Sequence, residues 1–143
     1  METLTLDKYE DFWVLASKAK TKHKYSPDFD VPPVRLIPLN DRDKLKAVVL
    51  ELLAERPKRI PMPDLNIEKL GIRPEAVGVK SNRAYQREAR VFFFQSSDEH
   101  LSIEEWKREK GGWVADPLWK EEFPPGDLDA LISCFIDKAH EAS

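Results

Sequence analysis

The sequence has one cysteine, five glycines in 143 residues and no long hydrophobic run. A single cysteine, Cys134, cannot form a disulfide within the chain, so the composition does not indicate an oxidising compartment. No window approaches the roughly 18 uninterrupted apolar residues that a membrane-spanning helix needs. The first twelve residues, METLTLDKYEDF, lack the basic and apolar regions of a secretory signal. We therefore expect a cytoplasmic protein that does not enter a membrane.

The motifs that carry common chemistries are also missing. There is no glycine-rich phosphate loop, no cysteine pair at zinc-binding spacing and no HExxH. The histidines His23, His100 and His140 are far apart in sequence, and we expect each on the surface. Cys134 lies in the apolar stripe of a predicted helix, where a small buried side chain is a simpler interpretation than a nucleophile. The sequence thus predicts no catalytic residue, no metal, no cofactor and no enzymatic activity.

Charge, by contrast, is abundant and unevenly distributed. Charged residues make up 34% of the chain and hydrophobic residues 41%, which is enough for one core in a single domain over residues 1–143. Residues 98–143 carry twelve acids and five bases, whereas the remainder carries fourteen acids and eighteen bases. An acidic region attracts a basic partner and speeds their encounter. The same charge argues against nucleic acid as the ligand of this region.

Apolar residues at helical spacing predict two amphipathic helices. The first follows Asp41, its expected N-cap, and ends before Pro57; its stripe consists of Leu45, Val48, Val49, Leu52 and Leu53. The second begins at Gly126 or Asp127, and its stripe consists of Leu128, Leu131, Ile132, Phe135, Ile136 and Ala139. A shorter helix is expected from a cap at Ser81 through Arg87.

Strands account for most of the rest. Residues 91–94 are an unbroken apolar run, which predicts a strand covered on both faces and away from the sheet edges. Residues 101–109 are expected to pair with residues 112–116 across a turn, and residues 34–37 form a further short strand. Residues 9–20 fit a helix or a strand, and their aromatic and valine content favours a strand. Together these elements predict an α+β domain with a mainly antiparallel sheet and amphipathic helices.

Residues 104–123, EEWKREKGGWVADPLWKEEF, hold three of the four tryptophans among many carboxylates. Glu104 and Glu105 are neighbours on a predicted strand, so they face opposite sides and do not converge as a catalytic pair. We expect Trp113 to point inward, whereas Trp119 lies beyond the last strand and is expected, with the surrounding carboxylates, to point partly outward as a candidate binding hot spot. The candidate partner-binding residues are Glu104, Glu105, Trp106, Glu109, Asp116, Trp119, Glu121 and Glu122.

Two ordered segments resemble a known family. They are VRLIPLNDRDKLKAVVLELLAERPKRIPMPD and GVKSNRAYQREARVFFFQSSDEHLSIEEWKREKGGWVADP. Their order resembles immunity proteins of bacterial contact-dependent growth inhibition systems, the CdiI type, over roughly residues 33–117. The family's pattern in these segments contains no catalytic motif and no transferable partner residues. The insertion KAKTKHKYSPDFDVPP departs from the pattern expected for the family.

The resemblance implies a cytoplasmic inhibitor that is a monomer when free. It would bind one cognate CdiA C-terminal toxin domain, often a nuclease, and block it stoichiometrically without a cofactor, a membrane or nucleic acid. The alternative from the residues alone is a small cytoplasmic enzyme or a nucleic-acid-binding regulator. In that alternative the lysine-rich residues 18–24 would bind phosphate, although a charged loop is the simpler interpretation.

Overall fold

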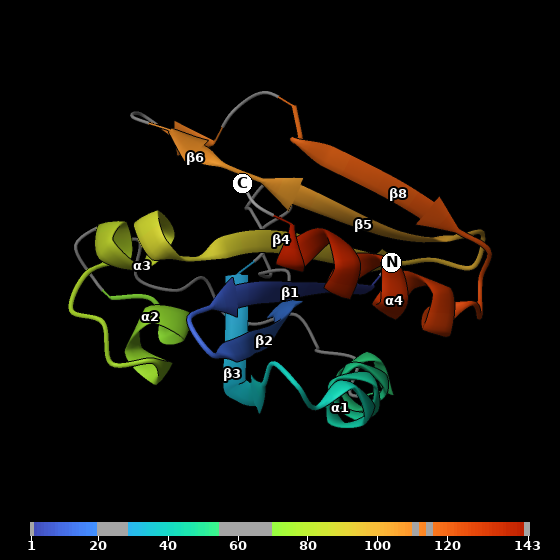
Figure 1. Cartoon of the computed structure of the whole chain (residues 1–143), viewed down its shortest axis with the longest axis horizontal. Coiled ribbons are helices and arrows are strands. Elements are labelled where there is room, and N and C mark those ends of the chain that lie inside the picture. The colour runs from blue at the N-terminus through green and yellow to red at the C-terminus, as the bar shows by residue number, and fades with distance from the viewer. Residues whose placement is uncertain (1, 20–28, 55–69, 110–111, 114–115, 142–143) are drawn as a thin grey trace.

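The described part of the chain forms a six-stranded antiparallel sheet, a two-stranded sheet and four helices (Figure 1). The computed structural model describes residues 2–19, 29–54, 70–109, 112–113 and 116–141. The elements in chain order are β1 (Glu2–Tyr9), β2 (Phe12–Ala19), β3 (Phe29–Pro38), α1 (Arg42–Ala54), α2 (Ile72–Ala76), α3 (Asn82–Glu88), β4 (Arg90–Ser96), β5 (Leu101–Trp106), β6 (Arg108–Glu109), β7 (Gly112–Trp113), β8 (Trp119–Phe123) and α4 (Leu128–His140).

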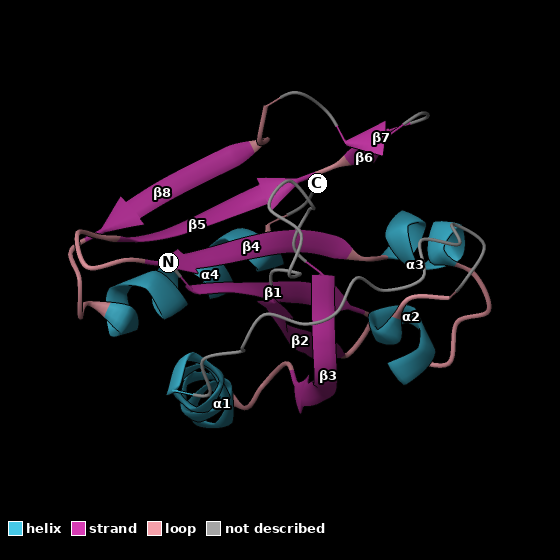
Figure 2. Ribbon diagram, turned by 180° about the vertical axis from the view of Figure 1, so that it is seen from behind, coloured by secondary structure: helices cyan, strands magenta, loops and turns pink. Residues whose placement is uncertain are grey.

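The strand order of the large sheet is β3-β2-β1-β4-β5-β8, and every neighbouring pair in it is antiparallel. The predicted α+β architecture is therefore confirmed. The apolar strand at residues 91–94 lies within β4, between β1 and β5, so its predicted position away from the edges is also confirmed. The edges belong to β3 and to the short strand β8, which lies along the outer side of the sheet (Figure 2).

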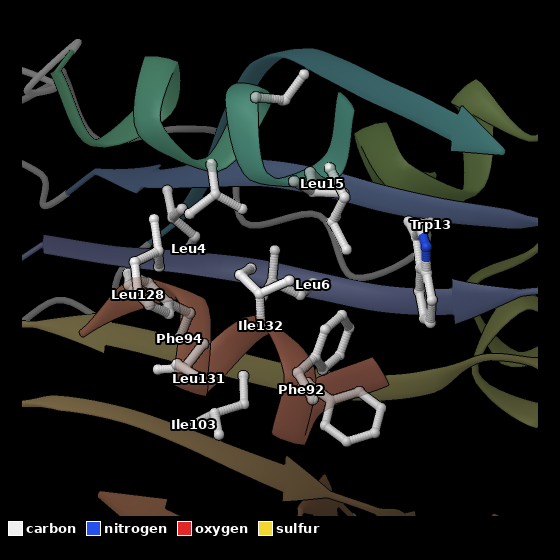
Figure 3. Packing of buried hydrophobic residues seen from close by; sticks show 14 of the residues in the cluster. Leu4, Leu6, Trp13, Leu15, Phe92, Phe94, Ile103, Leu128, Leu131 and Ile132 are labelled. Atoms are coloured by element: carbon white, nitrogen blue, oxygen red, sulfur yellow. The ribbon is translucent and has the colours of Figure 1, made fainter. Parts of the chain in front are cut away.

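One face of the sheet carries the main hydrophobic core. Alternate side chains of β1, β2, β4 and β5 point to this face, where α1 and α4 cover them (Figure 3). Both predicted amphipathic helices are confirmed by this arrangement. The fully buried members of the core include Leu6, Trp13, Leu15, Ile37, Leu45, Val49, Phe92, Phe94, Ile103, Leu131, Ile132 and Phe135.

The helices begin where their capping residues indicate. The side chain of Asp41 accepts a hydrogen bond from the backbone N–H of Lys44, and that of Asp127 accepts one from Ala130. Ser81 caps α3 in the same manner through the N–H of Ala84. Each side chain satisfies a backbone donor that has no partner within the helix, so all three predicted helix starts are confirmed. Pro57 lies outside the described residues.

The opposite face of the sheet is covered differently. At the end of β1, the helices α2 and α3 lie side by side against the sheet (Figure 1). A smaller apolar cluster is built there around Tyr9, Val14 and Tyr85, and the rings of the two tyrosines stack at 5.2 Å between centroids. Phe93 also points to this face and is only partly buried, beside Lys18 and Trp106. The prediction that this strand is covered on both faces is therefore confirmed at Val91, which is buried on this face, and holds only in part at Phe93.

Residues 9–19 comprise the last residue of β1, a turn at residues 10 and 11, and β2, so the preference for a strand is confirmed over the described residues. β1 itself is not among the predicted strands. Its apolar signal comes mainly from Leu4 and Leu6, because the alternating positions Thr5 and Asp7 are polar and yet fully buried. Residues 3–7, TLTLD, alternate polar and apolar side chains as a half-buried strand does, so the sequence carries the signal of a strand there, although its polar positions Thr5 and Asp7 are buried as well.

The C-terminal strands differ from the prediction in their pairing. β6 and β7 pair with each other as expected, but β5 pairs with β8 in the large sheet. Trp119, Glu121 and Glu122 therefore lie inside a strand, and their expected position beyond the last strand is wrong. The sequence WKEEF has three charged residues out of five, which is unusual for an interior strand. Such charges are common on edge strands, where they oppose pairing with other chains.

Candidate functional site

Three of the candidate binding residues belong, together with Lys120, to a polar ladder across β5 and β8. The indole N–H of Trp106 donates to Glu104 Oε2 at 2.8 Å. Glu104 also lies 3.4 Å from the Nζ of Lys120, and the same Nζ lies 3.4 Å from Glu122. The ladder therefore joins Trp106, Glu104, Lys120 and Glu122. Glu122 is well exposed at its outer end, so the ladder holds a carboxylate toward solvent in a defined position.

Trp119 lies on the other side of β8, where it faces helix α4. Its ring contacts Phe92 edge-on at 6.4 Å between centroids, and the ammonium of Lys138 lies 5.7 Å from the Trp119 centroid. The ring is partly buried and packs against the main core. Alternation along β8 turns the ring inward, so Trp119 is less exposed than expected, and its role as a binding hot spot stays a prediction. Its main contribution is to the core.

Glu105 is a structural residue and does not present its charge to a partner. Its side chain is buried and accepts two hydrogen bonds from Arg90, at 2.8 and 2.9 Å. The Nη1 of Arg90 in turn donates to the carbonyls of Lys138, Ala139 and Glu141 at the end of α4. A cation at this position satisfies carbonyls that the helix leaves unpaired. It is also stabilised by the negative end of the helix dipole. The inclusion of Glu105 among the binding residues is thus wrong.

The remaining candidates are distributed over the same region. Glu121 is exposed and projects from β8 on the side of α4, opposite Ile103 in register. Asp116 is exposed just before β8. The backbones of Glu109 and Trp113 lie in β6 and β7, but their side chains lie outside the described part. Glu104 and Glu105 face opposite sides of β5, as predicted, since one joins the ladder and the other Arg90.

Leu118 is a surface residue that the sequence did not single out. Its side chain is 58% exposed, although it is a large apolar residue. Its backbone N–H donates to the carbonyl of Glu105 at 2.8 Å, so its position beside β5 is fixed. The sequence alone does not show which of Leu118 and Trp119 faces solvent, because neighbouring residues along an extended chain point to opposite sides. The choice requires the start and register of β8, which begins at Trp119.

A buried network of charged side chains lies under α2, on the face opposite the main core. Asp7 is fully buried, and its Oδ2 accepts hydrogen bonds from the guanidinium of Arg73 and, at 2.6 Å, from the hydroxyl of Tyr85. Arg73 also donates from Nε to Asp30 Oδ2 at 2.8 Å. Lys18 Nζ lies 3.2 Å from Asp30 Oδ1. The network thus joins β1, β2, β3, α2 and α3 through two acids and two bases.

Burial and neighbouring opposite charges shift the pKa values of these groups in opposite directions. Burial raises the pKa of Asp7, and Arg73 and Tyr85 only partly counteract it. Burial also acts to raise the pKa of Asp30, but Arg73 and Lys18 outweigh it and hold that pKa below its usual range. Burial lowers the pKa of Arg73, whereas Asp7 and Asp30 raise it above its ordinary value. Because a desolvated charge is costly without its partner, the network ties α2 to the sheet.

Perturbed carboxylates can mark a catalytic site, but this network is closed to a substrate as it stands. Asp7 has no exposed surface. A surface hollow of about 410 Å³ is lined by Asp11, Phe12, Pro38, Leu39 and Asn40, none of which belongs to the network. Within the described residues, no group of three or more His, Cys, Asp or Glu side chains is placed to hold a metal ion. The geometry of the network fits a structural role.

The two histidines in the described part of the chain, His100 and His140, have different surroundings. His140 contacts Trp13 edge-on at 5.6 Å between centroids and lies beside Lys8, while His100 follows the turn after β4. His23 lies outside the described residues, as do residues 20–24 of the lysine-rich segment. His140 is exposed, as expected, whereas His100 is partly buried.

Cys134 lies on α4 and is partly buried. The sequence instead predicts a fully buried side chain. Burial raises the pKa of its thiol, and the nearby carboxylates of Glu121, Asp137 and Glu141 raise it further. We expect alkylation by iodoacetamide at pH 7.5 to be at least about fivefold slower in the folded protein than in urea, because the thiolate is the reacting form. Cys134→Ser should lower stability by less than about 1 kcal/mol, since the site is not fully buried. Rapid alkylation of the folded protein would instead identify an activated thiol.

No helix among the described residues is long and apolar enough to cross a membrane. Comparison with known proteins gives one informative result. No protein-family model and no curated protein matches the chain. Among solved structures, the chain is similar to a protein of unknown function from Neisseria meningitidis, NMB0488, with a TM-score of 0.66 and 16% identity over 97% of this chain and 93% of that one. At this identity the likeness shows a shared fold.

Proposed function

We propose that this protein is an immunity protein that binds and neutralises a cognate contact-dependent growth inhibition toxin domain in the cytoplasm. The proposal rests on the ordered resemblance to CdiI-type proteins and on one structural observation. The exposed edge of the sheet at β8 carries Glu121 and Glu122, with Asp116 just before it. A protein that acts by stoichiometric binding needs such a surface and does not need a reaction cleft.

The charge of this edge indicates the kind of toxin it would meet. A nuclease must bind polyphosphate, so its cleft is lined with basic side chains. Carboxylates held at the β8 edge can occupy such a cleft as a mimic of phosphate charge. Lys120 bridges Glu104 and Glu122 and offsets only one of their two negative charges, while Glu121 and Asp116 add to the negative charge of the edge. A nuclease toxin domain is therefore the partner class that this surface fits best.

The edge is also held in a defined conformation, which lowers the entropy lost on binding. β8 pairs with β5 over five residues, from Leu101 opposite Phe123 to Glu105 opposite Trp119. Trp119 fixes the inner side of β8 against the core, and the ladder from Trp106 to Glu122 fixes the outer side. A preorganised acidic edge is consistent with tight, stoichiometric inhibition.

Charge reversal of this edge should slow association with the toxin. The double variant Glu121→Lys, Glu122→Lys should reduce the association rate constant at least about tenfold at low ionic strength, since exposed charges steer encounter. The difference should shrink at high salt, where the charges are screened. Stopped-flow or surface-based kinetics at two salt concentrations would measure it. The matched control is Glu88→Lys, an exposed acid on α3 at the other end of the sheet.

If the double variant and the control associated at the wild-type rate, the acidic β8 edge would not be the interface. The function itself is tested in cells. Co-expression of this protein with the toxin domain encoded immediately upstream should restore growth that the toxin alone arrests. Restoration by the wild-type protein and loss of it in the charge-reversed variant is the expected result. Continued growth arrest despite folded, abundant immunity protein would refute the proposal.

A further inference from the structure

We propose that Leu118 is the apolar anchor of the toxin interface and inserts into an apolar pocket with a basic rim on the toxin. This inference rests on the proposed function and names an apolar residue at the centre of the proposed interface. The sequence points instead to Trp119, its neighbour. The structure exchanges their roles, because Trp119 packs on the core and Leu118 faces solvent.

The exposure of Leu118 is unusual. Its side chain is the most exposed of the large apolar residues in the described part of the chain, at 58%, ahead of Leu50 on α1 at 50%. Its backbone is held in place by the 2.8 Å hydrogen bond to the carbonyl of Glu105. Glu105 is itself locked by Arg90. Leu118 is therefore an apolar side chain on a rigid support.

The surroundings of Leu118 match the anatomy of a binding hot spot. Such sites place an apolar anchor at the centre and polar groups at the rim. Asp116 precedes Leu118 and is exposed, and β8 continues with the exposed Glu121 and Glu122. Trp106, at the end of β5, is partly buried and is held by its hydrogen bond to Glu104.

The position of β8 at the edge of the sheet explains how one partner can meet all of these groups. β8 pairs only with β5 in the described sheet. Glu121 and Glu122 project to opposite sides of the strand, so a partner that contacts only one face would reach only one of them. A partner docked against the edge reaches both, and Leu118 at the start of the strand. The net charge of this edge is negative, which selects a basic partner surface.

The test compares two leucines of similar exposure. Purified toxin domain from the gene immediately upstream is titrated with wild type, Leu118→Ala and Leu50→Ala, with dissociation followed directly. Leu118→Ala should raise Kd at least about 30-fold, equivalent to about 2 kcal/mol, mainly through faster dissociation. Leu50→Ala should stay within about twofold of wild type. Both variants should keep the wild-type urea midpoint, because neither side chain is buried.

A second variant separates lost contact from altered folding. Leu118→Gln keeps nearly the same size and is suited to an exposed position, yet it should weaken binding as Leu118→Ala does. If the wild-type protein binds the toxin and both Leu118→Ala and Leu118→Gln have a Kd within about twofold of the wild-type value, this inference is overturned. The proposed function would still stand. No binding by the wild-type protein would overturn both.

Discussion

Phe92→Asp should abolish cooperative folding. Phe92 has no exposed surface and contacts Phe135 edge-on at 4.9 Å between centroids, in the centre of the main core. The substitution removes an aromatic side chain worth about 3–5 kcal/mol and buries a carboxylate that costs several more. That sum approaches the whole stability of an ordinary domain, about 5–15 kcal/mol. Urea titration followed by circular dichroism should show no native baseline.

Phe93→Asp is the matched control, one residue along the same strand. Phe93 is partly buried on the opposite face, and the ammonium of Lys18 lies 5.5 Å from its ring centroid. An aspartate there keeps some contact with water and a nearby cation, so the variant should fold with a lowered urea midpoint. Equal effects of the two substitutions would contradict the assignment of the core to one face.

Arg73→Ala should cost about 3–5 kcal/mol of stability at neutral pH. The substitution leaves the buried carboxylates of Asp7 and Asp30 with Lys18 as their remaining cation. Breaking a buried ion pair from one side is costly because the remaining charge stays desolvated. Arg35→Ala is the control, because Arg35 pairs with Glu51 at the surface, and this loss should be below about 1 kcal/mol.

The pH dependence of the loss has a definite sign. In the wild type the lowered pKa of Asp30 contributes stability above the unfolded pKa, which is lost as pH falls through the folded pKa. The raised pKa of Asp7 acts oppositely, since its ionisation costs stability as pH rises above about 4. Without Arg73 the pKa values of both the Asp7 and the Asp30 carboxyl groups should be higher than in the wild type. The variant should therefore lose stability as pH rises.

The difference between wild type and Arg73→Ala should therefore be smaller at pH 4.5 than at pH 7. Each pKa unit by which the arginine favoured a carboxylate is worth about 1.4 kcal/mol. Urea unfolding of both proteins at the two pH values measures this difference, with Arg35→Ala alongside. A loss that is the same at both pH values would show that Arg73 stabilises the fold by contacts other than its charge.

The sequence predicts the fold well wherever one residue type recurs at regular spacing. The stripes from Leu45 to Leu53 and from Leu128 to Ala139 are confirmed as α1 and α4, and the caps Asp41, Ser81 and Asp127 are confirmed with them. β1 is not predicted although residues 3–7, TLTLD, alternate as a half-buried strand does. In β8 the charged residues Lys120, Glu121 and Glu122 obscure the apolar alternation, and they are exposed at the edge of the sheet.

The candidate site is predicted less well, because side-chain direction depends on where β8 begins. The acidic surface around Glu121 and Glu122 lies where the composition indicates, whereas Trp119 turns inward and Leu118 outward. Glu105 pairs with Arg90, 15 residues away, and no local pattern indicates this partner. The network around Asp7 depends on Arg73, 66 residues away. Contacts between such distant residues become visible only when the sheet is assembled.

Calorimetric titration of the purified protein into the toxin domain encoded immediately upstream tests the proposed function most directly. We predict a one-to-one complex with a Kd in the nanomolar range or below, and a Kd that rises as salt is raised. The same protein should give no heat with transfer RNA or duplex DNA. Absence of a complex at micromolar concentrations, or salt-dependent binding to the nucleic acids instead, would contradict the proposal that this is an immunity protein.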